Sequence, residues 1–481
     1  MPNLKSLFKD TAIYGISSIV GRFLNYLLVP LYSYKMAAAS GGYGIVTNVY
    51  SYTALLLVLL TFGMETTFFR FVNKENENPL RVYSTTLIAV GTVGLAFIAA
   101  VLCFLPMVAG WMGYASTPQY VGVMAVVVAL DAFQCIPFAY LRYQRKPLKF
   151  ATLKLLFIFL NILLNLAYFL GVKNPDVGYV FYINLVCTSV ITFFFYRELT
   201  GFRWTIDWKL LRRMLSYAWP LVILGVAGIL NQTADKILYP IVRDGQEGRV
   251  ELGIYGACVK VAMIMAMITQ AFRYAYEPFV FAGSKDKDSR EMYAKAMKYF
   301  IAFTLLAFLV VMGYLDLLKY IIGSDYREGL GVIPIVMVAE IMMGVYFNLS
   351  FWYKLTDRTI WGAILSGTGC LVLIAVNVIF IPKYHYMACA WAGVAGYGTA
   401  MVLSYFAGQH YFPIKYPLKS IAAYVLTAGV LFALMTLVPA DWPMAARLGI
   451  NTVLICAFLA HILYHDLPPR NLPFIGKYFR K

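Results

Sequence analysis

The chain has 481 residues, of which 61% are hydrophobic and 13% are charged, and its formal net charge is +17. A soluble domain carries about 45–50% apolar and about 25% charged residues, so no globular core could hide this much apolar surface from water. The composition excludes a soluble catalytic domain and a disulfide-linked secreted fold, and it predicts a chain that lies mostly in lipid.

Apolar stretches of helical length follow one another along the whole chain. A helix needs about 20 apolar residues to cross the hydrocarbon core, where a lone strand could not satisfy its backbone hydrogen bonds. We therefore expect an all-α, polytopic membrane protein with about 14 transmembrane helices. The expected spans are 12–34, 43–66, 83–106, 119–141, 148–171, 177–198, 214–240, 251–277, 296–318, 329–353, 359–382, 386–411, 418–438 and 443–464.

The positive charges indicate the orientation of these spans. Most of the 40 lysines and arginines lie in alternate connections, beginning with the amino-terminal segment. Because cytoplasmic loops are enriched in Lys and Arg, this bias places both termini in the cytoplasm. The basic loops then face anionic headgroups, so membrane lipids are expected partners. Nucleic-acid binding is not expected, because the charge is spread over many short loops.

Two parts of the sequence resemble each other. The markers of the first copy are Pro30, Tyr43-Gly44 and Glu65, and those of the second copy, in the same order, are Pro240, Tyr255-Gly256 and Glu277. An even number of expected helices separates the copies, so both run the same way through the membrane. We predict six-helix lobes at 1–205 and 206–412 around a central cleft, followed by two extra helices and a cytoplasmic tail at 413–481. This geometry suits alternating access.

Several cations fall inside the expected spans, where each costs roughly 2.5–3.5 kcal/mol unless it faces a cavity or a partner. Ser18, Arg22 and Asn25 share one helix face, and Lys154 begins a similar stripe with Asn161 and Asn165. The candidate ligands of an anionic substrate are Arg22, Arg273, Lys154, Lys260, Asn25 and Asn161. The alternatives are a structural ion pair for Arg22, and contact with lipid headgroups for Arg273 and Lys260.

The acids inside or at the ends of the spans are candidates for ion coupling or for gates: Asp131, Asp235, Glu340, Glu65 and Glu277. Asp131 and Glu340 lie near mid-helix, where they could bind a proton or a cation, or balance Arg22. Glu65 and Glu277 are expected at carboxyl-terminal helix ends, which disfavour an acid, so a basic partner or gate contact would be needed. Asp235 and Lys236 are adjacent and should point to different sides of the helix without pairing.

No cofactor and no metal site are predicted. The four histidines are dispersed, and only His461 and His465 share a helix face. Two histidines without a third ligand do not make a metal site. A coupling ion, H⁺ or Na⁺, is compatible with the acids, but no motif selects one.

Three stretches share their pattern with a known family. They are Asp10-Thr-Ala-Ile-Tyr-Gly-Ile-Ser-Ser-Ile-Val-Gly-Arg22; Tyr43-Gly-Ile with Phe62-Gly-Met-Glu65 and Arg70-Phe; and Asn231-Gln-Thr-Ala-Asp235-Lys236 with Leu252-Gly-Ile-Tyr255-Gly256. Together with two six-helix lobes and two extra helices, they resemble the polysaccharide transporters, or Wzx-type oligosaccharide flippases. This family is a branch of the multidrug/oligosaccharidyl-lipid/polysaccharide exporter superfamily.

The resemblance implies a non-enzymatic flippase of the bacterial inner membrane, which serves polysaccharide synthesis such as that of lipopolysaccharide O-antigen. Its partner would be an undecaprenyl-pyrophosphate-linked glycan, moved from the inner to the outer leaflet, and glycan polymerase machinery would be a further partner. In the related peptidoglycan-precursor flippases, arginines of helices 1 and 8 line a cationic cavity. Arg22 and Arg273 lie on the matching helices here.

Two other functions remain open at this point. A cation-coupled multidrug exporter of the same superfamily would have an acidic or aromatic cavity, and the cations within the spans argue against it. A membrane glycan polymerase or ligase would need a sizeable outer loop for its catalytic groups, and the outer connections 107–118 and 241–250 are short.

Overall fold

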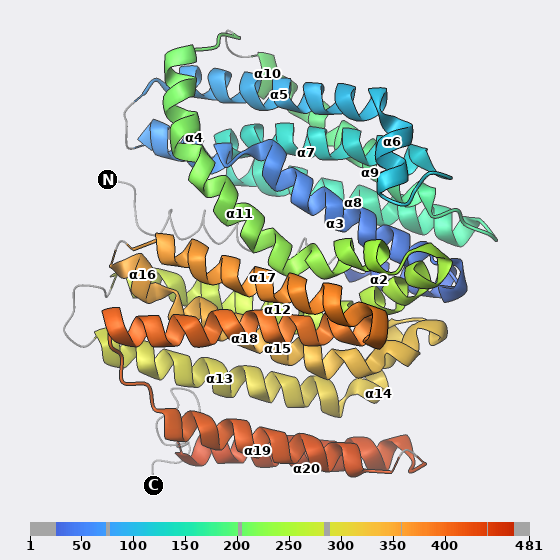
Figure 1. The fold of residues 1–481 in the computed structure, drawn as a ribbon, viewed down its shortest axis with the longest axis vertical. Helices are drawn as coiled ribbons and strands as arrows, with labels where there is room; N and C mark the ends of the chain where they lie inside the picture. Colours follow the sequence, from blue (N-terminus) through green and yellow to red (C-terminus); the bar gives the residue numbers. More distant parts are fainter. Residues whose placement is uncertain are drawn as a thin grey trace. The chain divides into compact units, whose positions relative to one another are not determined.

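The computed structural model describes residues 26–73, 77–200, 204–282, 289–356, 358–439 and 441–465. Within these ranges the chain forms helices and turns and no β-strand, which confirms the all-α prediction (Figure 1). Contacts divide the chain into two compact units. The first unit is Met1–Ala257 with Ser366–Ala392, and the second is Cys258–Leu365 with Gly393–Lys481.

The helices of the first unit are α2 (Leu28–Lys35), η1 (Ala38–Ser40), α3 (Gly42–Thr61), α4 (Met64–Asn73), α5 (Pro79–Cys103), α6 (Leu105–Trp111), α7 (Pro118–Tyr143), α8 (Pro147–Gly171), α9 (Gly178–Phe194), α10 (Tyr196–Thr200) and α11 (Trp208–Val242). Those of the second unit are α13 (Ser289–Gly313), α14 (Leu315–Leu318), η3 (Lys319–Ile321), η4 (Ser324–Gly331), α15 (Val332–Leu349), α16 (Phe351–Leu355), α19 (Leu418–Leu437) and α20 (Met444–His465). Three helices contribute to both units: α12 (Gly245–Ala282), α17 (Ile360–Tyr384) and α18 (Tyr386–Tyr411).

Twelve helical stretches in the described residues are long and apolar enough to cross a membrane. A further apolar helix, α9, has 17 residues. The expected span 12–34 lies mostly outside the described residues, so a count of fourteen is not established. The chain is a polytopic, integral membrane protein.

Local sequence explains where several helices begin. Pro79, Pro118 and Pro147 occupy first helical positions, where the missing N–H is not needed. Asp207 caps α11 by accepting hydrogen bonds from the amides of Lys209 and Leu210, both at 3.0 Å. These amides, Leu210 first, lower the pKa of Asp207.

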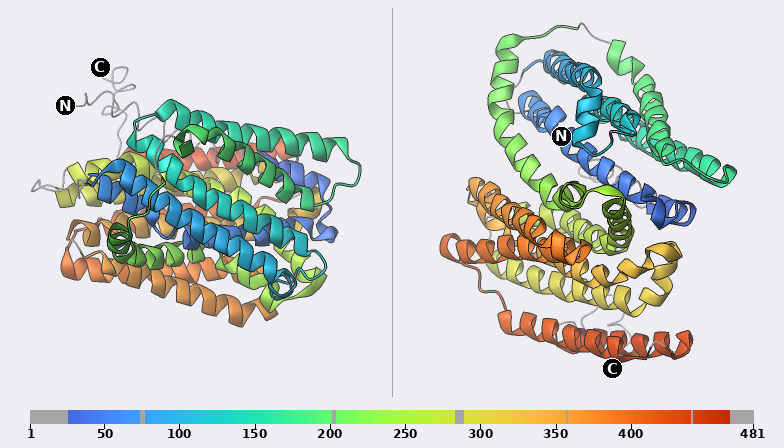
Figure 2. Two further views of the ribbon diagram at one scale, coloured as in Figure 1. Left: turned by 90° about the horizontal axis from the view of Figure 1, so that it is seen from above. Right: turned by 45° about the vertical axis from the view of Figure 1, so that its right-hand side comes forward.

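The long helix α11 curves along its length (Figure 2). Pro220 lies inside it, and an internal proline removes a backbone donor and bends a helix. The amino-terminal end of α11 packs on α4 and α5, where Met214 and Ala218 belong to an apolar cluster of the first unit. Tyr83 of α5 and Tyr140 of α7 stack in this cluster, with ring centres 4.1 Å apart.

The expected helix 43–66 is interrupted. Phe62 and Gly63 have φ values of +48° and +64°, a left-handed conformation that ends α3 and lets α4 begin. Glu65 therefore lies in the first turn of α4, and the expectation that it lies at a carboxyl-terminal helix end was wrong. The positive end of the helix dipole favours an acid there.

The two Tyr-Gly markers of the repeat lie where α3 and α12 cross. A Cβ on Gly44 would lie 1.9 Å from the backbone oxygen of Arg249, and a Cβ on Gly256 would lie 2.5 Å from Oγ1 of Thr47. Because no side chain fits at either position, the glycines allow the two backbones to approach closely. The two repeated glycines are thus packing residues in the first unit.

Candidate substrate site

A cavity of about 480 Å³ lies among α3, α4, α7, α8 and α9 of the first unit. It is lined by Leu57, Val58, Thr61, Glu65, Asp131, Gln134, Cys135, Phe138, Arg142, Phe150, Lys154, Phe157 and Ile191. Five of these residues come from one face of α7, at the helical spacing i, i+3, i+4, i+7 and i+11 from Asp131 to Arg142. Charged and polar side chains thus line part of a largely apolar cavity among these helices.

Lys154 is a charged residue in the middle of this apolar environment. It lies on the spanning helix α8, and its Nζ atom is 4.0 Å from the ring centre of Phe138. Within the described ranges, Lys154 makes this contact and no ion pair. An ammonium group held in hydrocarbon is costly, so its place beside a cavity indicates that water or a polar ligand solvates it.

Asp131 lines the same cavity and interacts electrostatically with Lys154. The hydroxyl of Thr188 on α9 donates to Asp131 Oδ1 at 3.3 Å. Gln134 is fixed in place because its Nε2 donates to the Thr188 backbone oxygen and to Thr192 Oγ1, both at 2.8 Å. The acid and the amide therefore present oxygen atoms on one wall of the cavity.

Glu65 forms an ion pair with Arg142, which supplies a basic partner for this acid. The Sγ atom of Cys135 donates to Glu65 Oε2 at 2.9 Å, and the Arg142 guanidinium lies 5.0 Å from the ring centre of Phe69. The side chains of Glu65 and Arg142 remain 41% and 32% exposed, so a ligand in the cavity could reach both.

The residues of the predicted polar stripe, Lys154, Asn161 and Asn165, have different surroundings in the structure. The Tyr32 hydroxyl donates to Asn165 Oδ1 at 2.8 Å, and Asn165 Nδ2 donates to the Asn161 backbone oxygen at 2.7 Å. Both amides are buried, and Asn165 connects α8 to α2, while Lys154 lines the cavity. Asn161 is not among the residues that line this cavity.

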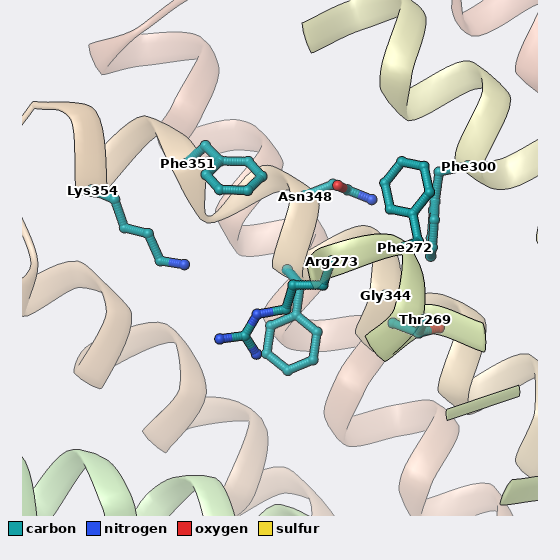
Figure 3. A pocket seen from close by; sticks show the side chains of 9 residues that line it. Thr269, Phe272, Arg273, Phe300, Gly344, Asn348, Phe351 and Lys354 are labelled. Carbon is teal, nitrogen blue, oxygen red and sulfur yellow. The ribbon is translucent and has the colours of Figure 1, made fainter. Parts of the chain in front are cut away.

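Arg273 lines a second, much smaller pocket in the second unit (Figure 3). Its volume is about 10 Å³, enough for one water molecule. The lining residues are Thr269, Phe272, Arg273, Phe300, Gly344, Phe347, Asn348, Phe351 and Lys354, and none of these described residues is acidic. The Arg273 guanidinium lies 4.9 Å from the Phe347 ring centre, and in Figure 3 the charged ends of Arg273 and Lys354 extend toward one another.

The expectation that Asp235 and Lys236 cannot pair was wrong. Lys236 Nζ lies 3.0 Å from both carboxylate oxygens of Asp235 and also donates to the Gln232 backbone oxygen at 2.9 Å. The long lysine side chain folds back along α11, which adjacent positions on a helix do not prevent. The Tyr255 hydroxyl adds a hydrogen bond of 2.6 Å to Asp235 Oδ2.

The remaining predicted residues are placed as follows. Lys260 on α12 and Glu340 on α15 are half-buried in the second unit. Glu277 lies on α12, and its side chain falls outside the described residues, as do Arg22 and Asn25 entirely. Over the described ranges, no group of three or more His, Cys, Asp or Glu residues is placed to hold a metal ion.

Sequence reasoning did not identify Gln134, Cys135, Arg142, Phe157 or Lys354 as lining residues. The spacing from Asp131 along α7 contains the signal for three of them, because it places Gln134, Cys135 and Arg142 on the face of Asp131. Arg142 lies one residue beyond the expected span 119–141, so hydropathy alone places it in a connection. Lys354 and Phe157 depend on packing between helices, which no local pattern encodes.

Comparison with known proteins gives consistent results. A family model described as "Polysaccharide biosynthesis protein" matches residues 40–330, more than half of the chain. A protein of the Lsg locus of Haemophilus influenzae is 20% identical over 415 residues, which cover 83% of this chain and 97% of that protein.

Solved structures share the fold at low identity. The lipid II flippase MurJ in an inward closed conformation matches with a TM-score of 0.74 and 14% identity, covering 94% of this chain and 99% of that chain. An inward-facing MATE-family multidrug resistance transporter of the MOP superfamily matches with a TM-score of 0.64 and 15% identity, covering 83% and 97%. The chain therefore belongs to the polysaccharide biosynthesis protein family, which confirms the predicted polysaccharide-transporter resemblance, and it has the fold of MOP-superfamily transporters.

Proposed function

We propose that this protein is a flippase that moves an undecaprenyl-pyrophosphate-linked oligosaccharide from the inner to the outer leaflet of the bacterial inner membrane. Both termini lie in the cytoplasm in this proposal. The observation that carries it is the charged cavity inside the spanning helices of a polysaccharide biosynthesis family member. A glycan headgroup needs such a hydrophilic passage, whereas its polyprenyl tail remains in the lipid.

The cationic side chains attract the pyrophosphate. Arg22 and Arg273 suit it through their forked donors, and Lys154 and Lys260 act as point charges. The position of Lys354 beside Arg273 supports this assignment, because it adds a second cation to the same pocket. Asn25 and Asn161 are proposed as neutral hydrogen-bonding neighbours of this path.

The membrane potential provides part of the driving force. An inside-negative potential favours outward movement of an anion by ~2.3 kcal/mol per charge per 100 mV. Alternating access of the predicted lobes carries the headgroup across, and binding of H⁺ or Na⁺ at Asp131, Asp235 or Glu340 resets the empty protein. Glu65 and Glu277 are the proposed gate residues, and the Glu65–Arg142 pair supports this role for the first of them.

The experiment that tests the proposal locates the lipid-linked glycan. Cells without the protein should accumulate it in the inner leaflet, and purified protein in proteoliposomes should move it between leaflets. Equal movement with and without the protein would contradict the proposal. Joining of glycans by the purified protein in detergent would instead establish a polymerase or ligase.

A cation-coupled multidrug exporter is the second candidate. The acids and the aromatic rings of the cavity favour it, because cationic drugs bind such groups, whereas Lys154 and Arg142 in the same cavity oppose it. Resistance of a sensitive host to cationic dyes on expression, lost in an Asp131→Asn variant, would support this alternative.

A further inference from the structure

The ionisable groups of the first unit's cavity balance one another. Glu65 pairs with Arg142, and Asp131 shares the cavity with Lys154, so the formal charge of these four lining groups is zero. A pyrophosphate in this cavity would lie beside two carboxylates and gain little from the two cations. The pocket of the second unit differs, since Arg273 and Lys354 line it and none of its described lining residues is acidic.

The same groups complement sugar hydroxyls, which are neutral and both donate and accept hydrogen bonds. Lys154 and Arg142 donate only, whereas Asp131 and Glu65 accept only. Gln134 adds an acceptor, because its hydrogen bonds to Thr188 and Thr192 use Nε2 and leave Oε1 for a ligand. The cavity thus offers donors and acceptors side by side, as a hydroxyl-rich ring requires.

Aromatic rings provide the apolar part of the lining. Phe138, Phe150 and Phe157 come from α7 and α8, and apolar ring faces cover the C–H faces of sugars well. Phe138 is already covered by Lys154 and packs edge-on against Phe150 at 5.3 Å, so the half-buried Phe157 is the ring available to a ligand. The volume of about 480 Å³ is within the range of about 300–1,000 Å³ typical of small-molecule sites.

We propose that this cavity is a sugar-binding subsite, which holds part of the glycan and thereby selects the cargo. The inference rests on the proposed function and changes one assignment in it: Lys154 serves the glycan instead of the pyrophosphate, which the remaining cations attract. Asp131, Gln134, Lys154 and Phe157 are the specificity-determining residues.

The test compares two probes bound to the full-length protein in nanodiscs. One probe is undecaprenyl pyrophosphate without sugar, and the other is the lipid-linked glycan pool extracted from cells that lack the protein. Asp131→Asn should weaken binding of the glycan lipid by about tenfold or more, through loss of a charged acceptor, and leave the bare lipid unchanged. Lys154→Met should behave in the same way. Asp441→Asn, an exposed acid outside the cavity, is the matched control.

Whether Asp131→Asn weakens or tightens binding distinguishes a sugar-binding site from a pyrophosphate-binding site. If the cavity holds the pyrophosphate, removing this negative charge tightens binding of both probes, and Lys154→Met weakens both, which would overturn the subsite. Phe157→Ala provides a second test if the charge variants fail to fold, with an expected loss of about tenfold for the glycan lipid alone. Equal affinity of the wild-type protein for both probes would refute the subsite while the proposed function stands. If neither probe binds, both the subsite and the proposed function are refuted.

Discussion

The crossing of α3 and α12 at Gly44 provides a sharp prediction about stability. In Gly44→Ala the new Cβ would lie 1.9 Å from the Arg249 backbone oxygen and 2.9 Å from the carbon that bears it. Neither atom can rotate away, because both belong to the backbone, so the helices must separate by roughly 1.5 Å to restore ordinary contact. Overpacking of this kind costs about 1–3 kcal/mol.

A control variant isolates this clash from the intrinsic effect of alanine. Alanine in place of glycine favours a helix by about 1 kcal/mol wherever space allows. Gly367 on α17 has no atom within 4 Å of its would-be Cβ, so Gly367→Ala should stabilise the protein. Gly256→Ala should fall between the two, because its nearest neighbour is the hydroxyl of the Thr47 side chain rather than a backbone atom.

The assay is thermal unfolding in detergent, followed with a thiol-reactive dye that reports buried cysteines as they become exposed. Cys187, Cys258, Cys370 and Cys389 are buried and supply the signal. The apparent Tm of Gly44→Ala should lie below that of Gly367→Ala by about 1–3 °C, because the unfolding entropy grows with chain length. Because such unfolding is irreversible, all variants need one heating rate. Equal melting of the two variants would refute the close crossing of α3 and α12.

Three further predictions concern the charged residues. Arg22→Ala should abolish display of the surface glycan while membrane insertion is retained. Arg22→Lys should restore part of the display, because lysine keeps the charge without the forked donors. Unchanged display in the alanine variant would remove Arg22 from the path. Glu65→Gln should slow leaflet-to-leaflet movement in proteoliposomes, because it breaks the ion pair with Arg142, and wild-type rates would exclude a gate role. Asp207→Ala should lower the apparent Tm at neutral pH through loss of the α11 cap. The folded-state pKa of Asp207 lies below its usual 3.8, so the stabilisation by this carboxylate is present above that pH and is lost as the pH falls through the folded-state pKa. The difference in apparent Tm between variant and wild type should therefore shrink in acid. A difference in Tm that is independent of pH would contradict this.

Much of the fold follows from composition and the length of apolar stretches. Burial in lipid forces each long stretch to be a helix, so spans such as 119–141 and 148–171 correspond to α7 and α8. The break at Phe62–Gly63 was not predicted, because a left-handed pair inside an apolar stretch depends on its packing rather than on hydropathy. Gly63 lies against Leu221 of α11, a contact remote in sequence.

The candidate site could be predicted residue by residue, but its assembly could not. The cost of a charge in hydrocarbon identifies Asp131 and Lys154 separately. Their meeting in one cavity requires the packing of α7 against α8, and the pairing of Asp235 with Lys236 requires a particular lysine side-chain conformation. Hydrophobic patterns contain neither piece of information.

The interruption between α3 and α4 has a consequence for how the cavity is filled. Leu57, Val58 and Thr61, in the last turn and a half of α3, line the cavity beside the break. Helix ends leave peptide groups without intrahelical partners, and hydrocarbon offers them none. We therefore expect water in the cavity before any cargo arrives. Loading is then an exchange of ordered solvent for hydroxyl groups of the cargo, and unloading requires the solvent to return.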